Sequence, residues 1–513
     1  MGFAFVLSAV PFALAGPDAQ LSLCSAPVST TNGCIIGHQA QKRSHVCEYL
    51  GVPYAVPPIG HLRFAPPEAF TSDETLIASA YVNCIQPSSR QVIYPEATPQ
   101  ELQILANFAN QAKNHSQSED CLALNIWTKP SNRTGKPTLV FFHGGRWTGG
   151  TSNTPYYDGQ FFADTEDVIV ITLNFRINIF GFPGAPGATQ NVGLLDQRRA
   201  VEWIRDNTVA FGGTPDKITI VGQSSGGVAV DFWSYSFRTD PIVSGLISHS
   251  GNAFSFPVNN QSLSSSYWYN VSTHVGCGNT GDVLPCMRSL NTSTLLAASS
   301  LARAPPQPSI ARSIPAFQPT IDNLTVFADY PSLSSAGAFA PIPYLHGNNH
   351  HESGYYRISA YASNNATAPE SVWTAFELES FTCPTARAAR HRARAAVPNW
   401  RYRYFADWDN LRLYPGSGAY HGAEMNMVIG NSEGVSRVSA SEDEERLSRV
   451  MMRAWAAFAG DPVMGLEREM GWPKYDEQGE TLGMLGFGDE GGLDFVGSGT
   501  YDGECGSLGD GVI

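Results

Sequence analysis

The sequence has few charged side chains, and its basic residues do not cluster. Charged residues make up 15% of the 513 residues, and Asp and Glu outnumber Lys and Arg by 46 to 32. Proteins that bind nucleic acid normally present a concentrated basic face, and no run of Lys or Arg supplies one here. The formal net charge of −14 also disfavours binding to polyanions. We therefore expect no nucleic-acid partner.

Long apolar runs are missing as well. Beyond the first residues, no segment reaches the roughly 18 uninterrupted apolar residues of a membrane helix, so we expect no integral membrane association. The C-terminal residues are rich in Gly and Asp and lack the hydrophobic tail of a lipid-anchor signal. Hydrophobic residues still make up 42% of the chain, which is enough to bury a large core.

The N-terminus resembles an export signal. The apolar run Phe3–Leu14 ends in the small-x-small sequence of residues 13–15, which predicts a signal peptide over residues 1–15. A buried N-terminal helix is the alternative. Nine cysteines fit an oxidising compartment, and their odd number leaves at least one without a partner in the chain. A secreted, extracellular glycoprotein is therefore expected. The candidate glycosylation sequons lie at Asn114, Asn132, Asn260, Asn270, Asn291, Asn323 and Asn365.

Short apolar runs alternate with helical segments along most of the chain. Val168–Leu173, Ile218–Val221 and Ile342–Leu345 have the composition of strands buried on both faces of a parallel sheet. Segments such as Asp196–Asn207 and Glu442–Phe458 between them are helix-like. This alternation predicts an α/β fold with a large, mostly parallel central sheet flanked by helices. We expect a single catalytic domain over residues 16–476 and a Gly-rich flexible tail over residues 477–513.

A candidate nucleophile follows one of the predicted strands. Residues 222–226 form a G-x-S-x-G pentapeptide centred on Ser224, after the apolar run Ile218–Val221 and before a plausible helix. In this strand–turn–helix context the glycines permit a sharp turn that exposes the serine hydroxyl. Such a serine needs a base to take its proton and donors for the developing oxyanion.

A glycine-rich loop after another predicted strand is the candidate oxyanion loop. His143 is followed by Gly144, Gly145 and Arg146. Backbone N–H groups of such a loop, with the N–H of Ser225 after the nucleophile, form the oxyanion hole of this kind of fold. An ordinary glycine turn is the alternative at this point.

Several ordered motifs carry a family resemblance. They include residues 49–55, 118–125, 174–176, 193–198 and 210–213. Over most of residues 33–475 the chain resembles the type-B carboxylesterase/lipase family, which includes the cholinesterases, and residues 401–430 resemble its fungal members. The resemblance implies an α/β-hydrolase fold and a catalytic order of Ser, Glu and His.

The resemblance also implies the partners of Ser224. Glu352 occupies the acid position in the segment 347–354, and His421 opens the family's H-G-x-E segment. Without the motifs, Glu352 beside His350 and His351 suggests either a surface carboxylate or a metal site, and His421 suggests a core histidine. With them, we expect a Ser224–His421–Glu352 triad that needs no metal or other cofactor.

Two positions depart from the family pattern. The family's third oxyanion glycine is Arg146 here, so Gly145 and Arg146 inherit the donor role through their backbone N–H groups. The Arg146 side chain is then expected to narrow the pocket or to bind part of the substrate. The residue before the serine is often Glu in the family and is Gln223 here, which removes a negative charge.

Other matched residues are expected to be structural. Arg63 with Glu119, and Arg176 with Asp196, resemble the family's two buried ion pairs. The resemblance implies the disulfides Cys84–Cys121 and Cys277–Cys286. A bond between Cys34 and Cys47 on neighbouring N-terminal strands is a further hypothesis. Cys24, Cys383 and Cys505 are left unassigned.

The expected function is hydrolysis of small-molecule or lipid carboxylic esters through an acyl-enzyme. One alternative is a triglyceride lipase whose lid is the Cys84–Cys121 loop, where Leu102, Leu105 and Phe108 recur at helical spacing; the same stripe is also typical of a helix packed on the body. A cholinesterase is disfavoured because Gln111 replaces the family's choline-site Trp. A non-catalytic binding or adhesion module is disfavoured because all three triad positions are filled.

Overall fold

The computed structural model describes residues 23–88, 93–109, 116–131, 133–304, 314–364, 367–489 and 491–508. The predicted signal peptide lies outside the described residues, as do the sequons at Asn114, Asn132 and Asn365. The other four sequon asparagines are exposed, and two of them, Asn260 and Asn291, also cap helices by accepting backbone N–H bonds.

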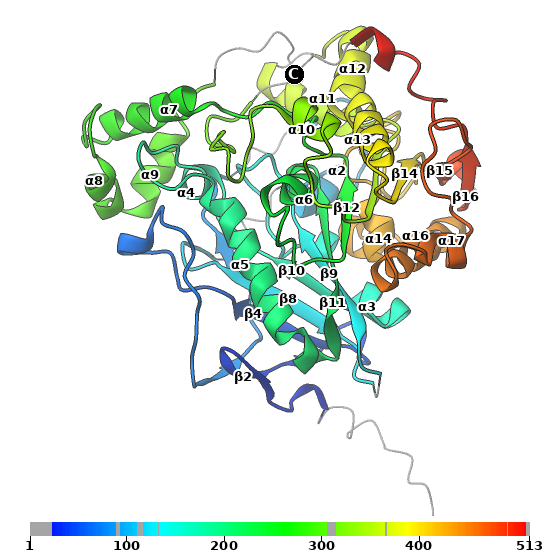
Figure 1. Ribbon diagram of the computed structural model, residues 1–513, viewed down its shortest axis with the longest axis horizontal. Coiled ribbons are helices and arrows are strands. Elements are labelled where there is room, and N and C mark those ends of the chain that lie inside the picture. Colours follow the sequence, from blue (N-terminus) through cyan, green and yellow to red (C-terminus); the bar gives the residue numbers. More distant parts are fainter. Residues whose placement is uncertain are drawn as a thin grey trace, which may run out of the picture.

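An 11-stranded sheet runs through the molecule (Figure 1). From β10 across to β15 neighbouring strands are parallel, and antiparallel strands extend the sheet at both edges. The predicted mostly parallel sheet is therefore confirmed. In spatial order the strands are β16 (Leu493–Val496), β15 (Leu482–Leu485), β14 (Asn399–Tyr404), β13 (Tyr344–Asn349), β12 (Gly245–His249), β11 (Gly213–Gln223), β9 (Lys136–Phe142), β10 (Ile169–Leu173), β8 (Ala123–Thr128), β4 (Cys47–Pro53) and β3 (His38–Gln39).

The central strands are buried on both faces. Along β9, Val140 and Phe142 belong to one hydrophobic cluster, and Leu139 and Phe141 belong to another on the opposite side. Successive side chains of a strand point to opposite faces, so each apolar run fills two cores at once. This explains why the central strands are continuous apolar runs instead of alternating ones.

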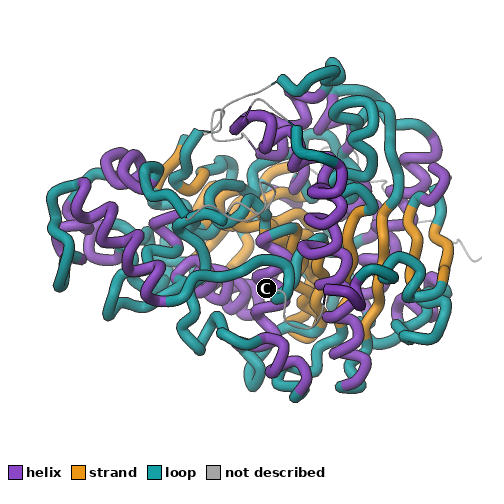
Figure 2. The backbone as a smooth tube through the Cα atoms, turned by 90° about the horizontal axis from the view of Figure 1, so that it is seen from above, coloured by secondary structure: helices purple, strands orange, loops and turns teal. Residues whose placement is uncertain are grey.

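Helices cover both faces of the sheet (Figure 2). Side chains of α5 and α6 pack in one core, and those of α3, α14 and α16 pack in the other. The helices are α2 (Glu101–Ala109), α3 (Gln160–Glu166), α4 (Asn178–Gly181), α5 (Val192–Asn207), α6 (Ser225–Ser236), α7 (Gln261–His274), α8 (Leu284–Ser289), α9 (Thr292–Ser299), α10 (Tyr330–Ser335), α11 (Ser353–Asn364), α12 (Glu370–Glu377), α13 (Cys383–Arg394), α14 (Met425–Ile429), α15 (Ser432–Ser436), α16 (Glu442–Gly460) and α17 (Gly465–Met470). In the described part of the chain, none is long and apolar enough to cross a membrane.

The segment after residue 476 differs from the flexible tail that the sequence suggests. β15 and β16 form an antiparallel pair at the edge of the main sheet, and the disulfide Cys383–Cys505 fastens the following residues to α13. Arg401 on β14 also forms a bidentate ion pair with Asp502. The sequence did not indicate these strands because each has only four residues, too few for a periodic pattern, and glycines surround them.

The N-terminal cysteines also pair differently from the hypothesis. Cys47 bonds to Cys24, and Cys34 is free. Cys34 lies on β2 (Gly33–Ile36), which belongs to a small separate sheet with β1 (Val28–Thr30) and β5 (Thr75–Ile77). Because Cys47 begins β4 of the main sheet, the two cysteines are not on neighbouring strands. The Cys34–Cys47 hypothesis was therefore wrong.

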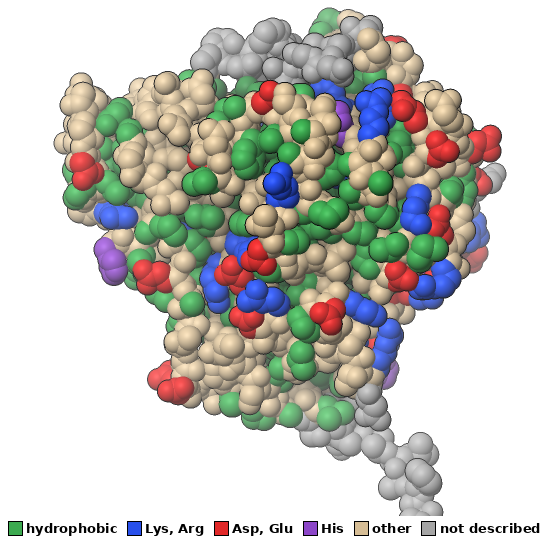
Figure 3. All heavy atoms as spheres, in the orientation of Figure 1, with side chains coloured by type: hydrophobic (Ala, Val, Ile, Leu, Met, Phe, Trp, Pro, Cys, Tyr) green, Lys and Arg blue, Asp and Glu red, His purple; other side chains and the backbone are tan. Residues whose placement is uncertain are grey.

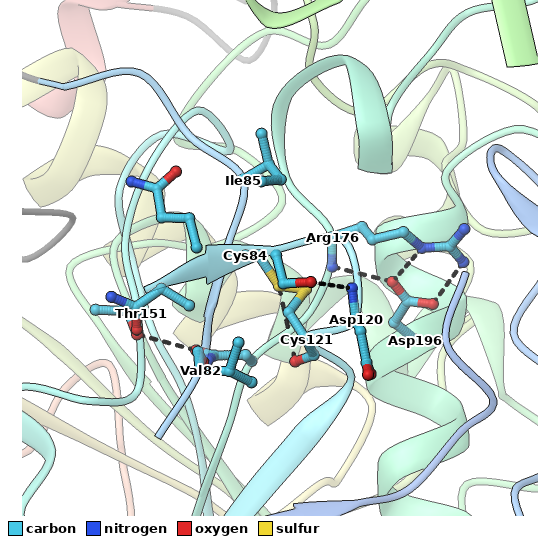
Figure 4. The surroundings of a disulfide bond; sticks show 12 residues. Val82, Cys84, Ile85, Asp120, Cys121, Thr151, Arg176 and Asp196 are labelled. Atoms are coloured by element: carbon cyan, nitrogen blue, oxygen red, sulfur yellow. Dashed lines mark hydrogen bonds and ion pairs between the residues drawn. A yellow bond between two sulfur atoms is a disulfide. The ribbon is translucent and has the colours of Figure 1, made fainter. Parts of the chain in front are cut away.

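The structure contains both disulfides that the resemblance implies. Cys84–Cys121 lies beside the buried ion pair of Arg176 and Asp196 (Figure 4), in which two guanidinium nitrogens contact the carboxylate at 2.7–2.8 Å. Cys277–Cys286 closes the loop between α7 and α8 in a helical lobe beside the sheet (Figure 1). The second ion pair, Arg63 with Glu119, supports that lobe because Arg63 also donates to the carbonyl of Arg288 at 2.9 Å.

Candidate active site

Ser224 occupies the sharp turn between β11 and α6. Its backbone has φ 57° and ψ −123°, a strained conformation for a residue with a side chain. A Cβ at Gly222 would lie 2.1 Å from the carbonyl oxygen of Gly226, and one at Gly226 would lie 2.2 Å from that of Phe142. Only glycine fits on either side of the serine. The positive end of the α6 dipole lies next to Ser224, because the helix begins at Ser225.

The predicted oxyanion loop lies directly beside this turn. A Cβ on Gly144 would approach the Cβ of Ser224 to 3.0 Å, so the loop and the nucleophile turn are in close contact. Gly145 has φ 114° and Arg146 has φ 56°. Gln86, which the sequence did not single out, fixes the end of the loop through two 2.9 Å hydrogen bonds with the backbone of Gly150.

Glu352 and His421 lie together under the surface. Glu352 follows β13, His421 lies in the connection between β14 and α14, and the exposed fractions of the two residues are 1% and 2%. Nδ1 of His421 is 2.6 Å from Oε2 of Glu352. The other carboxylate oxygen accepts hydrogen bonds from the hydroxyl of Ser250 and the backbone N–H of Asn349, at 2.6 and 2.7 Å. The carboxylate is therefore fixed on both oxygens.

The second imidazole nitrogen and the serine hydroxyl have neighbours that the sequence did not predict. Nε2 of His421 lies 3.1 Å from the amide nitrogen of Gln223. Tyr356 on α11 lines two cavities together with Ser224. Both tyrosines that follow the acid, Tyr355 and Tyr356, reach the site. The signal was present in the sequence, since α11 begins directly after Glu352 and places its first turn at the same sheet edge.

Aromatic rings enclose the imidazole of His421. Tyr356 and Phe381 lie with ring centroids 5.0 and 5.2 Å from it, and Tyr355 lies at 6.3 Å. This apolar surrounding excludes water and strengthens the electrostatic interaction with Glu352. Burial raises the pKa of Glu352, and the charge of His421 opposes that rise.

A cavity of about 240 Å³ and a smaller one of about 40 Å³ both reach Ser224. Ser224, Arg146 and Tyr356 line both cavities. The larger one also contains His421, Gln223 and the glycine-rich loop. The nucleophile thus lies at the junction of two spaces of unequal size, which can hold the two halves of an ester.

The α2 helix borders the larger cavity and buries two of the three residues of the predicted stripe in part. Leu105 and Phe108 are partly buried against the core, whereas Leu102 is 37% exposed. Ile104, outside the stripe, is fully buried. Phe108 also lines the cavity, with its ring 4.9 Å from that of Tyr355. α2 therefore packs on the body through Ile104, Leu105 and Phe108, and Phe108 contributes a ring to the site.

The metal-site alternative has no support in the described part of the chain, where no group of three or more His, Cys, Asp or Glu side chains is placed to hold a metal ion. Nδ1 of His350 accepts a hydrogen bond from Nε of Arg403 at 3.1 Å. Burial and the nearby Arg403 lower the pKa of His350 to about 4. His350 is thus engaged away from Glu352.

Comparison with known proteins agrees with this architecture. The sequence pattern of the carboxylesterase family matches residues 25–376 and 358–491. The chain is 32% identical to secreted lipase 5 of Gibberella zeae, over 94% of each chain, and 32% identical to a chlorogenic acid esterase of Aspergillus niger, over 93% of each. A solved structure of a thermophilic pNB esterase superposes with a TM-score of 0.79 at 25% identity, covering 94% of this chain and all of that one.

The chain therefore belongs to the carboxylesterase family. It has the α/β-hydrolase fold and is a carboxylic ester hydrolase.

Proposed function

We propose that the protein cleaves carboxylic esters with Ser224 as nucleophile, His421 as base and Glu352 as the acid that orients His421. The observation that carries this proposal is the 2.6 Å contact between Nδ1 of His421 and Oε2 of Glu352 beside the strained Ser224 turn. The contact requires a proton on Nδ1, so Nε2 is left free to accept one. Base and nucleophile then line the same cavity, and the orienting acid is bonded to the other nitrogen of the base.

The reaction proceeds in two halves. His421 takes the hydroxyl proton as Ser224 Oγ attacks the ester carbonyl, and the backbone N–H groups of Gly145, Arg146 and Ser225 bind the oxyanion. The alcohol leaves with the proton held by His421, and the acyl group remains on Ser224. Water then attacks the acyl-enzyme, gives its proton to His421, and releases the carboxylic acid and the free serine. In the resting state, Nε2 of His421 contacts the amide of Gln223. For the reaction it must contact the hydroxyl of Ser224 instead. Catalytic hydrogen bonds often form only when substrate is bound.

Replacement of the nucleophile tests the assignment. We expect Ser224→Ala to lower kcat by about 10⁴ or more, the size found when a triad serine is removed. A fluorophosphonate probe should label the wild type and not this variant. Ser300→Ala, at an exposed serine away from the cavities, is the matched control and should be labelled normally. Near-normal ester turnover by Ser224→Ala would overturn the triad.

Triglyceride hydrolysis is the second candidate, and the position of α2 favours it. This helix lies in the Cys84–Cys121 loop and places Phe108 in the cavity wall, and one relative is a secreted lipase. A rate that rises sharply as a triglyceride passes its solubility limit would identify a lipase. A rate that saturates below that limit would identify an esterase of soluble substrates.

We further propose that the enzyme is secreted. Four disulfides, the predicted signal peptide and the secreted relative support this localisation. Expression in a secreting host should yield protein in the medium whose N-terminus follows residue 15. Treatment with an endoglycosidase should increase its mobility through loss of glycans at exposed sequons such as Asn270. Retention of residues 1–15 in the mature protein would contradict the proposal.

A further inference from the structure

The two cavities at Ser224 share one unusual lining residue. Among the described Asp, Glu, Lys and Arg residues, only Arg146 lines the larger cavity, and the same holds for the smaller one. The other lining residues are aromatic, aliphatic, glycine, histidine or neutral polar residues. Although the formal net charge of the chain is −14, the only permanently charged residue that lines the two cavities in the described part of the chain is therefore a positive one.

This local charge contrasts with the surface. On the face shown in Figure 3, the Lys and Arg side chains drawn in colour are interspersed with Asp and Glu. No carboxylate of the described residues lines either cavity, so a negative group that enters them meets no fixed like charge there.

The positive charge of Arg146 acts on two tyrosines near the nucleophile. Burial raises the pKa of Tyr355, and the positive charge of Arg146 opposes that rise. Burial and Glu352 raise the pKa of Tyr356, and Arg146 again opposes them. Both phenols line the larger cavity, and Tyr356 lines the smaller one as well, together with Ser224. A positive charge that acts on both phenols also acts on a substrate bound between them.

The backbone at Arg146 gives a second, independent indication. Its φ of 56° is a conformation that suits glycine and disfavours a residue with a Cβ. Strain of this kind persists where the surrounding structure requires it and is concentrated at functional sites. The oxyanion loop uses only backbone N–H groups, which glycine would supply without strain. The side chain of Arg146 is therefore the part that needs a separate explanation.

We propose that Arg146 selects esters that carry a carboxylate group, binding that group while the ester carbonyl lies over Ser224. This inference rests on the proposed function and names its substrate class. A guanidinium presents two parallel N–H donors that match the two oxygens of a carboxylate, which a neutral substrate lacks. Because the Arg146 side chain is exposed at the cavity mouth, the preference is moderate in size and sensitive to salt.

Two pairs of matched esters test the proposal. On the alcohol side, 4-acetoxybenzoate is compared with 4-acetoxybenzamide. On the acyl side, monomethyl terephthalate is compared with methyl 4-carbamoylbenzoate. Within each pair the size is nearly constant and only the charge changes. The readout is the ratio of kcat/KM for the charged ester to that for the neutral ester, so that any general effect of a variant on catalysis cancels.

The variants separate charge from backbone. Arg146→Gln keeps the backbone N–H, and we expect it to lower the ratio about 5-fold for at least one pair, the size of an exposed ion pair. Arg146→Lys should retain part of the preference, and Arg146→Glu should lower the ratio further. In the wild type the ratio should fall as NaCl is raised from 0.05 to 0.5 M, a range over which the screening length shortens from about 14 to about 4 Å. Arg238→Gln, at an exposed arginine that lines neither cavity, should leave the ratio unchanged.

The outcomes distinguish the two proposals. If the wild type cleaves the neutral esters and the ratio is the same in wild type, Arg146→Gln and Arg146→Glu for both pairs, the carboxylate preference is overturned while ester hydrolysis stands. If the wild type cleaves none of the four esters and the fluorophosphonate probe does not label Ser224, the proposed catalytic function itself fails.

Discussion

The amide nitrogen of Gln223 lies 3.1 Å from Nε2 of His421, the nitrogen that must accept the proton of Ser224. Because Nδ1 of His421 faces Glu352, Nε2 carries a lone pair and Gln223 donates to it. The residue before the nucleophile therefore contacts the nitrogen that acts as the base. A charge on the side chain at position 223 would act directly on this nitrogen, and Gln223 is neutral.

Gln223→Glu should move the acid limb of the pH profile of kcat/KM to higher pH, by about one unit. A carboxylate beside the imidazole stabilises the protonated ring, and a protonated ring cannot act as base. Gln223→Met, which removes the donor without adding charge, should move the limb upward by less, because only the hydrogen bond to the neutral ring is lost. Profiles measured between pH 5 and 9 would check both, and an acid limb that stays in place in Gln223→Glu would contradict the assigned contact.

Tyr356→Phe should lower kcat about 5-fold with little change in KM. Tyr356 lines both cavities together with Ser224, so its hydroxyl can donate to the reacting serine, and loss of one such hydrogen bond is worth about 1 kcal/mol. Tyr355→Phe is the matched control, because Tyr355 lines the larger cavity but not the smaller one. Steady-state kinetics on one neutral ester would compare them. Equal losses in both variants would mean that the ring environment, and not a bond to Ser224, determines the effect.

The fold and the order of the three proposed catalytic residues could be predicted from the sequence, because both depend on local sequence patterns. The apolar run before Ser224 and the glycines around it define a strand and a turn wherever they occur. The contact of Gln223 with His421 could not be predicted, since it joins segments that only the finished sheet brings together. In the same way, Cys24 and Cys34 are both near Cys47 in sequence, and the pairing with Cys24 becomes clear only when Cys34 is seen to lie in a different sheet from Cys47.

Removal of the disulfide that fastens the C-terminal segment should destabilise the protein. The double variant Cys383→Ala/Cys505→Ala releases a loop with a sequence separation of 122, and removal of a native disulfide typically costs about 2–5 kcal/mol. Cys277→Ala/Cys286→Ala, with a separation of 9, is the control and should lower Tm less. Thermal unfolding without reductant would compare the two. A larger loss from the short loop would contradict the role assigned to the C-terminal bond.

Glu48→Gln should make stability less dependent on pH between pH 4.5 and 7. Burial raises the pKa of Glu48 from its ordinary value of 4.5 to about 7, against the opposing hydrogen bond from Trp127. The indole N–H donates at 2.9 Å, and the other oxygen lies 3.0 Å from Nε2 of His38, whose pKa burial lowers. The raised pKa of Glu48 and the lowered pKa of His38 both favour the uncharged forms of these two side chains.

The sign of this effect follows from the raised pKa. Protonated Glu48 is preferred in the folded state, so its contribution to stability is fully present below pH 4.5 and is lost as the pH rises through 7. A glutamine cannot ionise and keeps that contribution at every pH. Glu48→Gln should therefore unfold at a higher temperature than the wild type at pH 8, with a smaller difference at pH 4.5. Glu68→Gln, at an exposed carboxylate, is the control. Parallel Tm profiles for wild type and Glu48→Gln would show that Glu48 stays charged in the folded protein.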